Sequence, residues 1–480
     1  MAAWIATALY LADLAIKVIA LGVVPRNRRP SSGMAWLLLI LIIPFGGILL
    51  FLMLGRTSLG RRRHAQQAEV NAEVAERTAP VPTLGTDFDG PAYVQSAATL
   101  NRNLGALPAM PGNAIALYPG YADSIAAMTA EIERAQSFVH VEFYISAWDD
   151  VTAPFFDALV RAKGRGVTVR MLFDHLGSRG IPGYQEFLTR LEAAGIDAHA
   201  MLPIHPLKGQ WRRPDLRNHR KILVVDGGVA FTGSQNLTEP GYNKPKNHKA
   251  GREWVELMAR VEGPVATALN VLFATDWYSE TGEKLEDEIG VVAPPSGEVE
   301  AQVIPSGPGF ATENNLRLFT TLIYSAQKRL SITSPYFVPD ESLLYAVTTA
   351  AQRGVEVELF VSEQGDQFMV FHAQRSYYEA LLRAGVRIYF YPAPWILHAK
   401  FFSVDDDVAV LGSSNMDMRS FALNYEVSLM MLGPDIVAKV RDVEDEYRRV
   451  SKELTLDDWL ARGRGSAYID NVMRLTAALQ

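Results

Sequence analysis

Two stretches of the sequence share one spaced pattern, and this pattern decides the fold. His219–Asn236 reads HRKILVVDGGVAFTGSQN, and His398–Asn415 reads HAKFFSVDDDVAVLGSSN. Each stretch begins His-x-Lys, places an Asp five residues after the Lys, and ends Gly-Ser-x-Asn. Six fixed positions would match by chance at about one start site in 10⁸. Two matches in one chain therefore indicate a duplicated functional unit.

The duplication extends to the sequence on either side of the two stretches. AQSFVHVEFYIS from Ala135 and GRGVTVRMLFD from Gly164 correspond to AQKRLSITSPYFV from Ala326 and QRGVEVELFV from Gln352. Each apolar run has the composition of a strand, and a helical length of chain separates it from the next. The pattern predicts βαβ units in an α/β fold, with strands over ILVVD (222–226) and FFSVD (401–405) and helices covering the sheet.

A linker separates the two copies. VVAPPSGEVE, residues 291–300, combines two prolines with Ser and Gly, which are typical of a connecting loop. Glu256 and Glu426 each lie seven residues before a Gly-Pro pair, so the repeat continues beyond the motifs. We expect a first half over 113–290 and a second half over 300–480, facing each other around a pseudo-two-fold axis.

Length and composition limit the class of protein. With 480 residues, 49% of them hydrophobic and 21% charged, the chain is long enough for two or three packed domains. A net charge of −7 argues against a general nucleic-acid binder, which usually has a basic face. The sequence contains no cysteine, which excludes disulfides, thiol nucleophiles and thiolate metal sites.

The N-terminal 55 residues have the composition of a transmembrane hairpin. Residues 34–54 contain no charge and would form a helix about 31 Å long, enough to cross a bilayer core. Residues 4–24 form a second apolar run, in which Asp13 and Lys17 lie four apart and can pair on one helix face. A buried soluble helix and a signal peptide are the alternatives for the two runs.

Basic residues flank the apolar runs and predict their orientation. Arginines lie between the runs and after the second one, and their distribution favours a cytoplasmic C-terminal side. Residues 56–112 are expected to be a tether, because a polar helical stretch there is followed by prolines and a glycine. The sequence therefore predicts a multi-pass membrane protein with its larger C-terminal part in the cytoplasm.

The residue types of the two motifs fit chemistry on a phosphodiester. Residues i and i+2 of a strand share a face, so His219 lies beside Lys221 and His398 beside Lys400. One neutral imidazole can attack phosphorus while the other protonates the leaving alkoxide. Lysines and amides can hold the phosphate oxygens. The candidate supporting residues are Ser234, Asn236, Ser413 and Asn415, together with Glu256 and Glu426, which can orient the imidazoles.

Asp226 and Asp405 are candidates for two different roles. Each is a fixed member of the motif and is therefore a candidate catalytic residue. Each also lies where a strand meets a turn, before GG or DD, where an Asp that forms a turn is at least as good an interpretation.

The remaining polar features of the chain have other interpretations. Six histidines without a partner in the other half are interpreted as structural or surface residues: His140, His175, His199, His205, His248 and His372. The basic run over 208–220 fits a site for anionic head groups and a solvated loop equally well. We expect no metal, since a lysine beside each histidine repels a cation and no HExxH-type arrangement is present.

The motifs resemble the HKD motif of the phospholipase D superfamily, and the whole chain resembles its bacterial cardiolipin synthases. The resemblance rests on NHRKILVVDG from Asn218, REWVELMARVEGPV from Arg252 and NMDMRSFALNYE from Asn415. The last segment is the most discriminating of the three. The sequence departs from the family pattern at Ser234, where a second Gly is usual, and at Glu256, where Asp is more frequent.

The resemblance implies duplicated α/β/α sandwich halves and a defined reaction. A phosphatidyl group would move from one phosphatidylglycerol to a hydroxyl of another, giving cardiolipin and glycerol. The transfer would pass through a phosphohistidine on His219 or His398 and need no metal or cofactor. In the family, the lysine and asparagine of each motif bind phosphate.

Three other functions remain open from the residues alone. A phospholipase D-type hydrolase or transphosphatidylase would use water or another alcohol or head group as acceptor, through the same intermediate. A nuclease of the same fold disagrees with the apolar N-terminus and the acidic balance. A catalytically inactive binding protein disagrees with two complete motifs. The sequence predicts neither the oligomeric state nor which histidine is the nucleophile.

Overall fold

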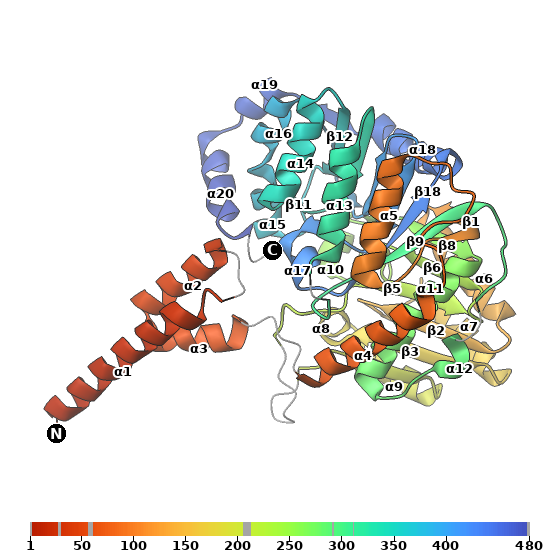
Figure 1. Ribbon diagram of the computed structural model, residues 1–480, viewed down its shortest axis with the longest axis horizontal. Helices are drawn as coiled ribbons and strands as arrows, with labels where there is room; N and C mark the ends of the chain where they lie inside the picture. The colour runs from red at the N-terminus through yellow and green to blue at the C-terminus, as the bar shows by residue number, and fades with distance from the viewer. Residues whose placement is uncertain are drawn as a thin grey trace. The chain divides into compact units, whose positions relative to one another are not determined.

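The computed structural model describes residues 2–26, 30–55, 61–204, 213–289, 292–310 and 312–477. The chain forms two compact units, Met1–Leu59 and Gly60–Gln480. The smaller unit contains the apolar runs, and the larger one contains both motifs (Figure 1).

The smaller unit consists of three helices instead of the expected hairpin of two spans. They are α1 (Ala2–Val23), α2 (Pro30–Ile42) and α3 (Pro44–Leu54). In the described residues of this unit, one helix is long and apolar enough to cross a membrane, over Trp4–Val23 of α1. The expected Asp13–Lys17 pair is present, with Nζ and Oδ2 2.9 Å apart.

The predicted second span is broken at Pro44. The Pro44 nitrogen carries no hydrogen, so the helix stops at Ile42 and a new one begins. The rings of Trp36 and Phe51 lie 5.5 Å apart, whereas a continuous helix would separate them by about 22 Å. Gly47 packs so closely on Ile40 that a Cβ there would lie 2.8 Å from the Ile40 Cα. The chain therefore folds back on itself within 34–54.

The larger unit is built around one continuous sheet of 15 described strands. Their order is β19-β13-β12-β10-β15-β16-β18-β9-β1-β8-β6-β5-β2-β3-β4. The two halves follow the same order from the centre outward, with β9 equivalent to β1 and β18 to β8. The halves join where β1 and β9 pair antiparallel, Met110 opposite Ala301. This arrangement confirms the duplicated α/β fold.

The strands of the first half are β1 (Met110–Tyr118), β2 (Phe138–Phe143), β3 (Thr168–Asp174), β4 (Asp197–Met201), β5 (Lys221–Val225), β6 (Val229–Gly233), β7 (Trp254–Val255) and β8 (Met258–Glu262). Its helices are α6 (Tyr121–Arg134), α7 (Ala153–Gly164), α8 (His175–Arg179), α9 (Tyr184–Ala193), α10 (Pro245–Lys249), α11 (Pro264–Thr281) and α12 (Glu286–Ile289). The order β2-β3-β4 is parallel, as βαβ units require, and β5 pairs antiparallel with β2.

The strands of the second half are β9 (Val299–Ser306), β10 (Arg329–Thr333), β11 (Phe337–Val338), β12 (Glu356–Ser362), β13 (Arg387–Tyr391), β14 (Ile396–Leu397), β15 (Phe401–Val404), β16 (Val408–Gly412), β17 (Met416–Asp417), β18 (Glu426–Leu432) and β19 (Lys452–Leu454). Its helices are α13 (Asn314–Ser325), α14 (Glu341–Gln352), α15 (Phe368–Arg375), α16 (Tyr378–Ala384), α17 (Met418–Ala422), α18 (Pro434–Val450), α19 (Leu456–Leu460) and α20 (Arg464–Arg474).

Helices cover both faces of the sheet, which explains why its central strands are apolar throughout. On one face, α6, α7 and α9 pack on the first half and α13, α14 and α16 on the second. On the other face, α11 and α18 share one core that draws residues from both halves, including Leu269 and Val440. The two halves therefore form one body with a common core, and their motif strands have fixed relative positions.

The segment expected to be a tether is folded from residue 61 onward. It forms α4 (Arg61–Thr78) and α5 (Ala92–Gly105), and α5 lies beside α13 of the second half (Figure 1). Val94 and Ala98 belong to the core of that half, and Asn101 Nδ2 donates to the Val303 carbonyl at 3.0 Å. Apolar residues at helical spacing in α5 explain the difference from the expectation, because they bury a face that a tether would leave in water.

Candidate active site

The two motifs meet where the backbone of each half forms a hydrogen bond with the backbone of the other half. The His219 N–H donates to the Tyr425 carbonyl at 2.8 Å, and the His398 N–H donates to the Val255 carbonyl at 2.7 Å. Tyr425 immediately precedes Glu426, and Val255 immediately precedes Glu256. Each histidine is therefore fixed, through its own backbone, beside the glutamate of the opposite half.

The side chains repeat this exchange. His219 Nδ1 lies 2.9 Å from a carboxylate oxygen of Glu426, and His398 Nδ1 lies 2.7 Å from one of Glu256. All four side chains are buried. An Nδ1–H that donates to a carboxylate fixes the imidazole tautomer and leaves Nε2 free for chemistry, as in other histidine–carboxylate pairs.

The two lysines make the same backbone hydrogen bond in both motifs, and Lys400 Nζ also lies 3.1 Å from His398 Nδ1. Lys221 Nζ donates to the His219 carbonyl, and Lys400 Nζ donates to the His398 carbonyl, each at 2.6 Å. Burial lowers the pKa of Lys221 to about 7 and that of Lys400 to about 8, against the pull of the two glutamates. Both ammonium groups therefore lie in a dry site where an anion would be their strongest partner.

The electrostatics of the site couple the two motifs. Burial lowers the pKa of His219 well below its ordinary value, and Lys221, Lys400 and His398 lower it further. Burial also lowers the pKa of His398, but there Glu256 opposes the shift. Burial raises the pKa of Glu426 to about 7. Two lysines and two imidazoles gathered in one buried site are suited to binding a negatively charged phosphodiester.

The serines and asparagines of the motifs are not equivalent between the halves. Ser234 Oγ and Ser413 Oγ contact equivalent backbone carbonyls, of Leu257 at 3.3 Å and of Val427 at 3.2 Å, and only Ser413 also donates to Glu426, at 2.5 Å. The Asn236 amide donates to the Tyr242 hydroxyl at 2.8 Å, and its Oδ1 accepts from the Ile145 N–H. Asn415 Oδ1 is buried and has no hydrogen-bond partner among the described residues. Asn415 is thus the amide whose oxygen remains available.

The structure places Asp226 and Asp405 at the opposite ends of their strands from the histidines. The Asp226 carboxylate accepts from the backbone N–H groups of Gln136, Ser137 and Phe138 at 2.8–2.9 Å. Asp405 accepts from the equivalent three N–H groups, over 327–329, at 2.7–2.9 Å. Each strand separates Asp from His by about 20 Å. This geometry supports the turn interpretation and not a catalytic one.

The other sequence candidates lie in structural contacts. His140, His199, His248 and His372 pair with Glu288, Asp197, Glu239 and Asp470 in that order, at 2.7–2.9 Å. His175 is buried in α8 and Nδ1 accepts a 3.4 Å bond from the Ile204 N–H. His205 and residues 208–212 lie outside the described residues. From the rest of the basic run, Arg217 pairs with Asp174, and Arg220 pairs with Asp276 inside the protein.

Two tyrosines that the sequence reasoning did not single out adjoin the histidines. The Tyr144 ring lies edge-on to His219 with centroids 5.0 Å apart, and the Tyr336 ring lies edge-on to His398 at 6.2 Å. Tyr144 follows β2 and Tyr336 follows the equivalent strand β10, in the repeated segments VEFYIS and ITSPYFV. Alignment of those two segments would have revealed them.

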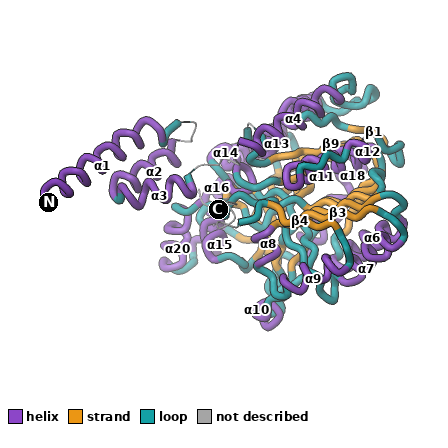
Figure 2. Tube along the Cα trace, turned by 90° about the horizontal axis from the view of Figure 1, so that it is seen from below, coloured by secondary structure: helices purple, strands orange, loops and turns teal. Residues whose placement is uncertain are grey.

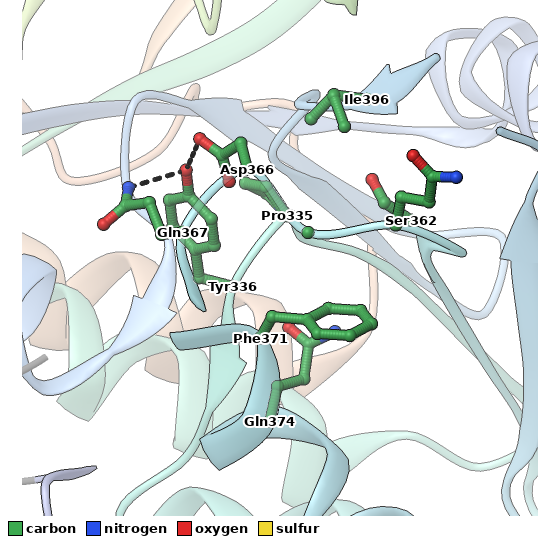
Figure 3. Close-up of a pocket in the computed structure, with 10 residues that line it drawn as sticks. Pro335, Tyr336, Ser362, Asp366, Gln367, Phe371, Gln374 and Ile396 are labelled. Carbon is green, nitrogen blue, oxygen red and sulfur yellow. Dashed lines mark hydrogen bonds between the residues drawn. The ribbon is translucent and has the colours of Figure 1, made fainter. Parts of the chain in front are cut away.

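A small pocket lies next to Tyr336, the residue whose ring contacts His398. Figure 3 shows Tyr336 and Asp366 in its wall, opposite Phe371. The Tyr336 hydroxyl donates to Asp366 Oδ2 at 2.8 Å and accepts from Gln367 Nε2 at 2.9 Å. One residue of the pocket wall therefore adjoins the histidine of the second motif.

Comparison with known proteins agrees with this geometry. The family described as "Cardiolipin synthase, PLD-like domain" matches residues 128–277 and 319–446, and "Phospholipase_D-nuclease N-terminal" matches 15–56. Cardiolipin synthase A of Proteus mirabilis is 35% identical over 91% of this chain and 90% of its own. The enzyme of the same name from Pectobacterium carotovorum is 34% identical over 94% and 93%. The crystal structure of a Haemophilus influenzae phosphatidylserine synthase shares the fold, with a TM-score of 0.61 at 16% identity over 80% of this chain and 99% of that one.

Proposed function

The chain belongs to the cardiolipin synthase family of phospholipase D-like proteins, and we propose that it makes cardiolipin and glycerol from two molecules of phosphatidylglycerol. The observation that carries the proposal is the pair of buried histidines, each oriented by a glutamate of the opposite half. Family membership supplies the substrate class, and the site supplies a chemistry that fits it. Of the described residues, no three His, Asp or Glu side chains form a group able to hold a metal ion.

The transfer proceeds in two displacements at phosphorus. One imidazole Nε2 attacks the phosphorus of the first phosphatidylglycerol, and the bond to the glycerol oxygen breaks as the other imidazole gives that oxygen a proton. The phosphatidyl group is then held on the first histidine. The second histidine takes the proton of an incoming hydroxyl, the new P–O bond forms, and the nitrogen leaves. Each proton that is donated in the first step is recovered in the second.

The phosphate is held by the cations and amides of both motifs in this proposal. Lys221 and Lys400 offset the charge of the non-bridging oxygens, and burial makes that contribution large because water does not screen it. Asn415 donates to the phosphate through its Nδ2 hydrogens in this proposal, and Asn236 does so after its Nδ2 exchanges the Tyr242 hydroxyl for phosphate. Ser413 holds Glu426, and Ser234 fixes the backbone before β8. In this proposal the first half, residues 113–290, supplies the motif that begins at His219, and the second half, residues 300–480, supplies the motif that begins at His398.

We place the acceptor alcohol in the pocket next to Tyr336. Asp366 retains Oδ1 for hydrogen bonds, since Tyr336 uses Oδ2. A carboxylate accepts from the two hydroxyls of a glycerol head group, while Phe371 and Ile396 exclude water from its carbon chain. Hydrolysis, or transfer to another alcohol, remains the alternative outcome.

The proposed location is the bacterial inner membrane, with the larger unit in the cytoplasm. Helix α1 supplies a segment of spanning length, and the α2–α3 pair supplies two apolar helices too short to span singly. The multi-pass expectation therefore depends on whether α2 and α3 open into one span in the bilayer. The arginines after the apolar runs support the cytoplasmic side.

The experiment that tests the function is lipid analysis of the purified protein in detergent with phosphatidylglycerol alone. Cardiolipin with free glycerol is the expected result. Phosphatidic acid with glycerol would show that water is the acceptor and would replace the proposal with hydrolysis. No turnover by a folded enzyme would reject phosphatidylglycerol as donor, and other donor and acceptor lipids would then be tried.

A further inference from the structure

The C-terminal helix α20 exposes its apolar side chains to solvent. Tyr468 is 71% exposed, Val472 36% and the following Leu475 84%. These three residues are spaced i, i+4 and i+7 and therefore share one face of the helix. Ile469, 38% exposed, lies beside them. A helix on the surface of a soluble protein normally turns such a face inward.

Polar contacts on the opposite face hold the helix in this orientation. Asp470 is fully buried and accepts from His372 Nδ1 at 2.7 Å and from Arg375 Nε at 3.3 Å. Arg375 also donates to the Ser466 hydroxyl at 3.2 Å. Hydrogen bonds and ion pairs therefore hold the inner face of α20 against α15. The apolar residues lie on the opposite face of the helix and point away from the protein.

The exposed apolar surface continues onto α15 and reaches the pocket. Helices α15 and α20 lie side by side, as both views show (Figures 1 and 2). Phe368 is 63% exposed and its ring lies 4.4 Å from that of His372, the partner of Asp470. Met369 is 44% exposed, and the neighbouring Gln367 and Phe371 line the pocket. We name the apolar face by its six residues: Phe368, Met369, Tyr468, Ile469, Val472 and Leu475.

We propose that this apolar face docks on the lipid bilayer and holds the pocket at the membrane surface. Charge supports a lipid occupant: Arg464 and Arg474 are exposed at the two ends of α20, while its one acidic residue is buried, so anionic head groups are attracted. Continuity with the pocket supports it also, and here the inference rests on the proposed function. A lipid whose head group reaches His398 must leave its acyl chains in an apolar surrounding.

The first test measures contact with lipid directly in the full-length protein. The sequence has no cysteine, so Leu475→Cys or Val472→Cys gives a single labelling site. With an environment-sensitive fluorophore in vesicles of phosphatidylcholine and phosphatidylglycerol, we expect doxyl-labelled lipids to quench these labels at least about twofold more than a label at Val160→Cys. Val160, on α7, is 38% exposed and is the matched control. Equal quenching at all three sites would overturn the proposal.

The second test separates docking from chemistry. Tyr468→Ser/Val472→Ser/Leu475→Ser should lower cardiolipin formation in vesicles about tenfold, because membrane affinity scales with buried apolar area. Turnover of short-chain phosphatidylglycerol in dilute solution should be unchanged, and Val160→Ser should alter neither. Equal loss on both substrates would assign α20 to folding and reject docking. If the labels on α20 became less exposed to water as more protein was added per vesicle, without quenching by doxyl lipids, a second copy of the chain would cover the face.

If short-chain substrate gives no cardiolipin with the unaltered enzyme, the proposed function fails, whereas the quenching result still decides the docking.

Discussion

His219 in the first half is oriented by Glu426 in the second, and His398 in the second half is oriented by Glu256 in the first. The Nδ1-to-carboxylate distances are 2.9 Å and 2.7 Å. Neither half contains a complete histidine–carboxylate pair, since the carboxylate on each histidine comes from the other half. In the proposed reaction, both halves are therefore needed to orient each imidazole.

Loss of either glutamate should impair the histidine of the opposite half. We expect Glu256→Gln and Glu426→Gln to lower kcat about 10²- to 10⁴-fold, because the amide permits the wrong imidazole tautomer and does not stabilise its cation. Steady-state rates of cardiolipin formation measure the effect. His219→Ala and His398→Ala should abolish transfer, and near-normal turnover in either variant would contradict the shared site. Glu363→Gln, outside the site, is the control for loss of a carboxylate.

Asp226 and Asp405 should affect stability and leave the chemistry intact. Each carboxylate accepts three backbone N–H bonds in a turn, with φ of 50° and 48°. Replacement by Ala should cost about 1–3 kcal/mol of folding free energy, since unpaired donors and an unfavourable left-handed residue remain. Asp405→Ala should cost more than Asp226→Ala because Asp405 is buried and Asp226 is exposed.

Two measurements distinguish a structural from a catalytic role of these aspartates. Chemical denaturation gives the folding stability, and kcat per folded molecule gives the activity. A stable Asp405→Ala protein with kcat lowered more than about 10²-fold would restore the catalytic interpretation. The Asp→Asn variants tolerate the left-handed backbone and should lie between wild type and Ala in stability.

The alkaline side of the pH profile should report the lysines. Burial lowers the pKa of Lys221 to about 7 and of Lys400 to about 8, so in the free enzyme both ammonium groups lose their proton as the pH rises through this range. We expect kcat/KM to begin to fall above about pH 7, where Lys221 loses its proton, and to fall further above about pH 8 with Lys400, because it follows the protonation of the free enzyme. On the acid side it should fall below about pH 7, where Glu426 becomes protonated.

Lys221→Arg tests this assignment, because a guanidinium stays charged over the whole range. Its alkaline limb should move upward even if its maximal rate is lower. An alkaline limb that stays unchanged in both Lys221→Arg and Lys400→Arg would assign the titration to another group.

Removal of divalent cations should leave the activity intact. Each histidine has a lysine beside it, and Lys221 and Lys400 act electrostatically on His219 in a sense that repels cations. Activity after EDTA treatment and gel filtration should stay within about twofold of the untreated value. A loss that zinc or magnesium reverses would mean that the site uses a metal after all.

Asp366 should control the choice between alcohol and water. We expect Asp366→Asn to lower the ratio of cardiolipin to phosphatidic acid about tenfold, with total consumption of phosphatidylglycerol less affected. Glu363→Gln is the matched control, because its carboxylate accepts from the Ala393 N–H and does not line the pocket. An unchanged product ratio would move the acceptor site elsewhere.

The sequence by itself determined the duplication and the α/β class, and it predicted the histidines, lysines and glutamates that the structure brings together. These follow from short-range pattern, because apolar runs at strand spacing and His-x-Lys at i and i+2 have local consequences that the rest of the fold does not change. Even the two glutamates could be found, by their equal distances from Gly-Pro. The Asp13–Lys17 pair was predictable for the same reason, since both residues lie on one helix.

Only the tertiary structure decided which carboxylate serves which histidine, and which motif residues leave the site. Glu426 reaches His219 because β18 and the start of β5 are brought together across the two halves, 207 residues apart, and no local pattern encodes that pairing. Asp226 faces the turn before β2 through strand pairing of the same kind. The folded segment from α4 to α5, the break at Pro44 and the outward apolar face of α20 likewise depend on which surfaces pack together. Contacts between residues far apart in the sequence determine which surfaces become buried. The periodicity of apolar residues within one helix or strand does not determine this.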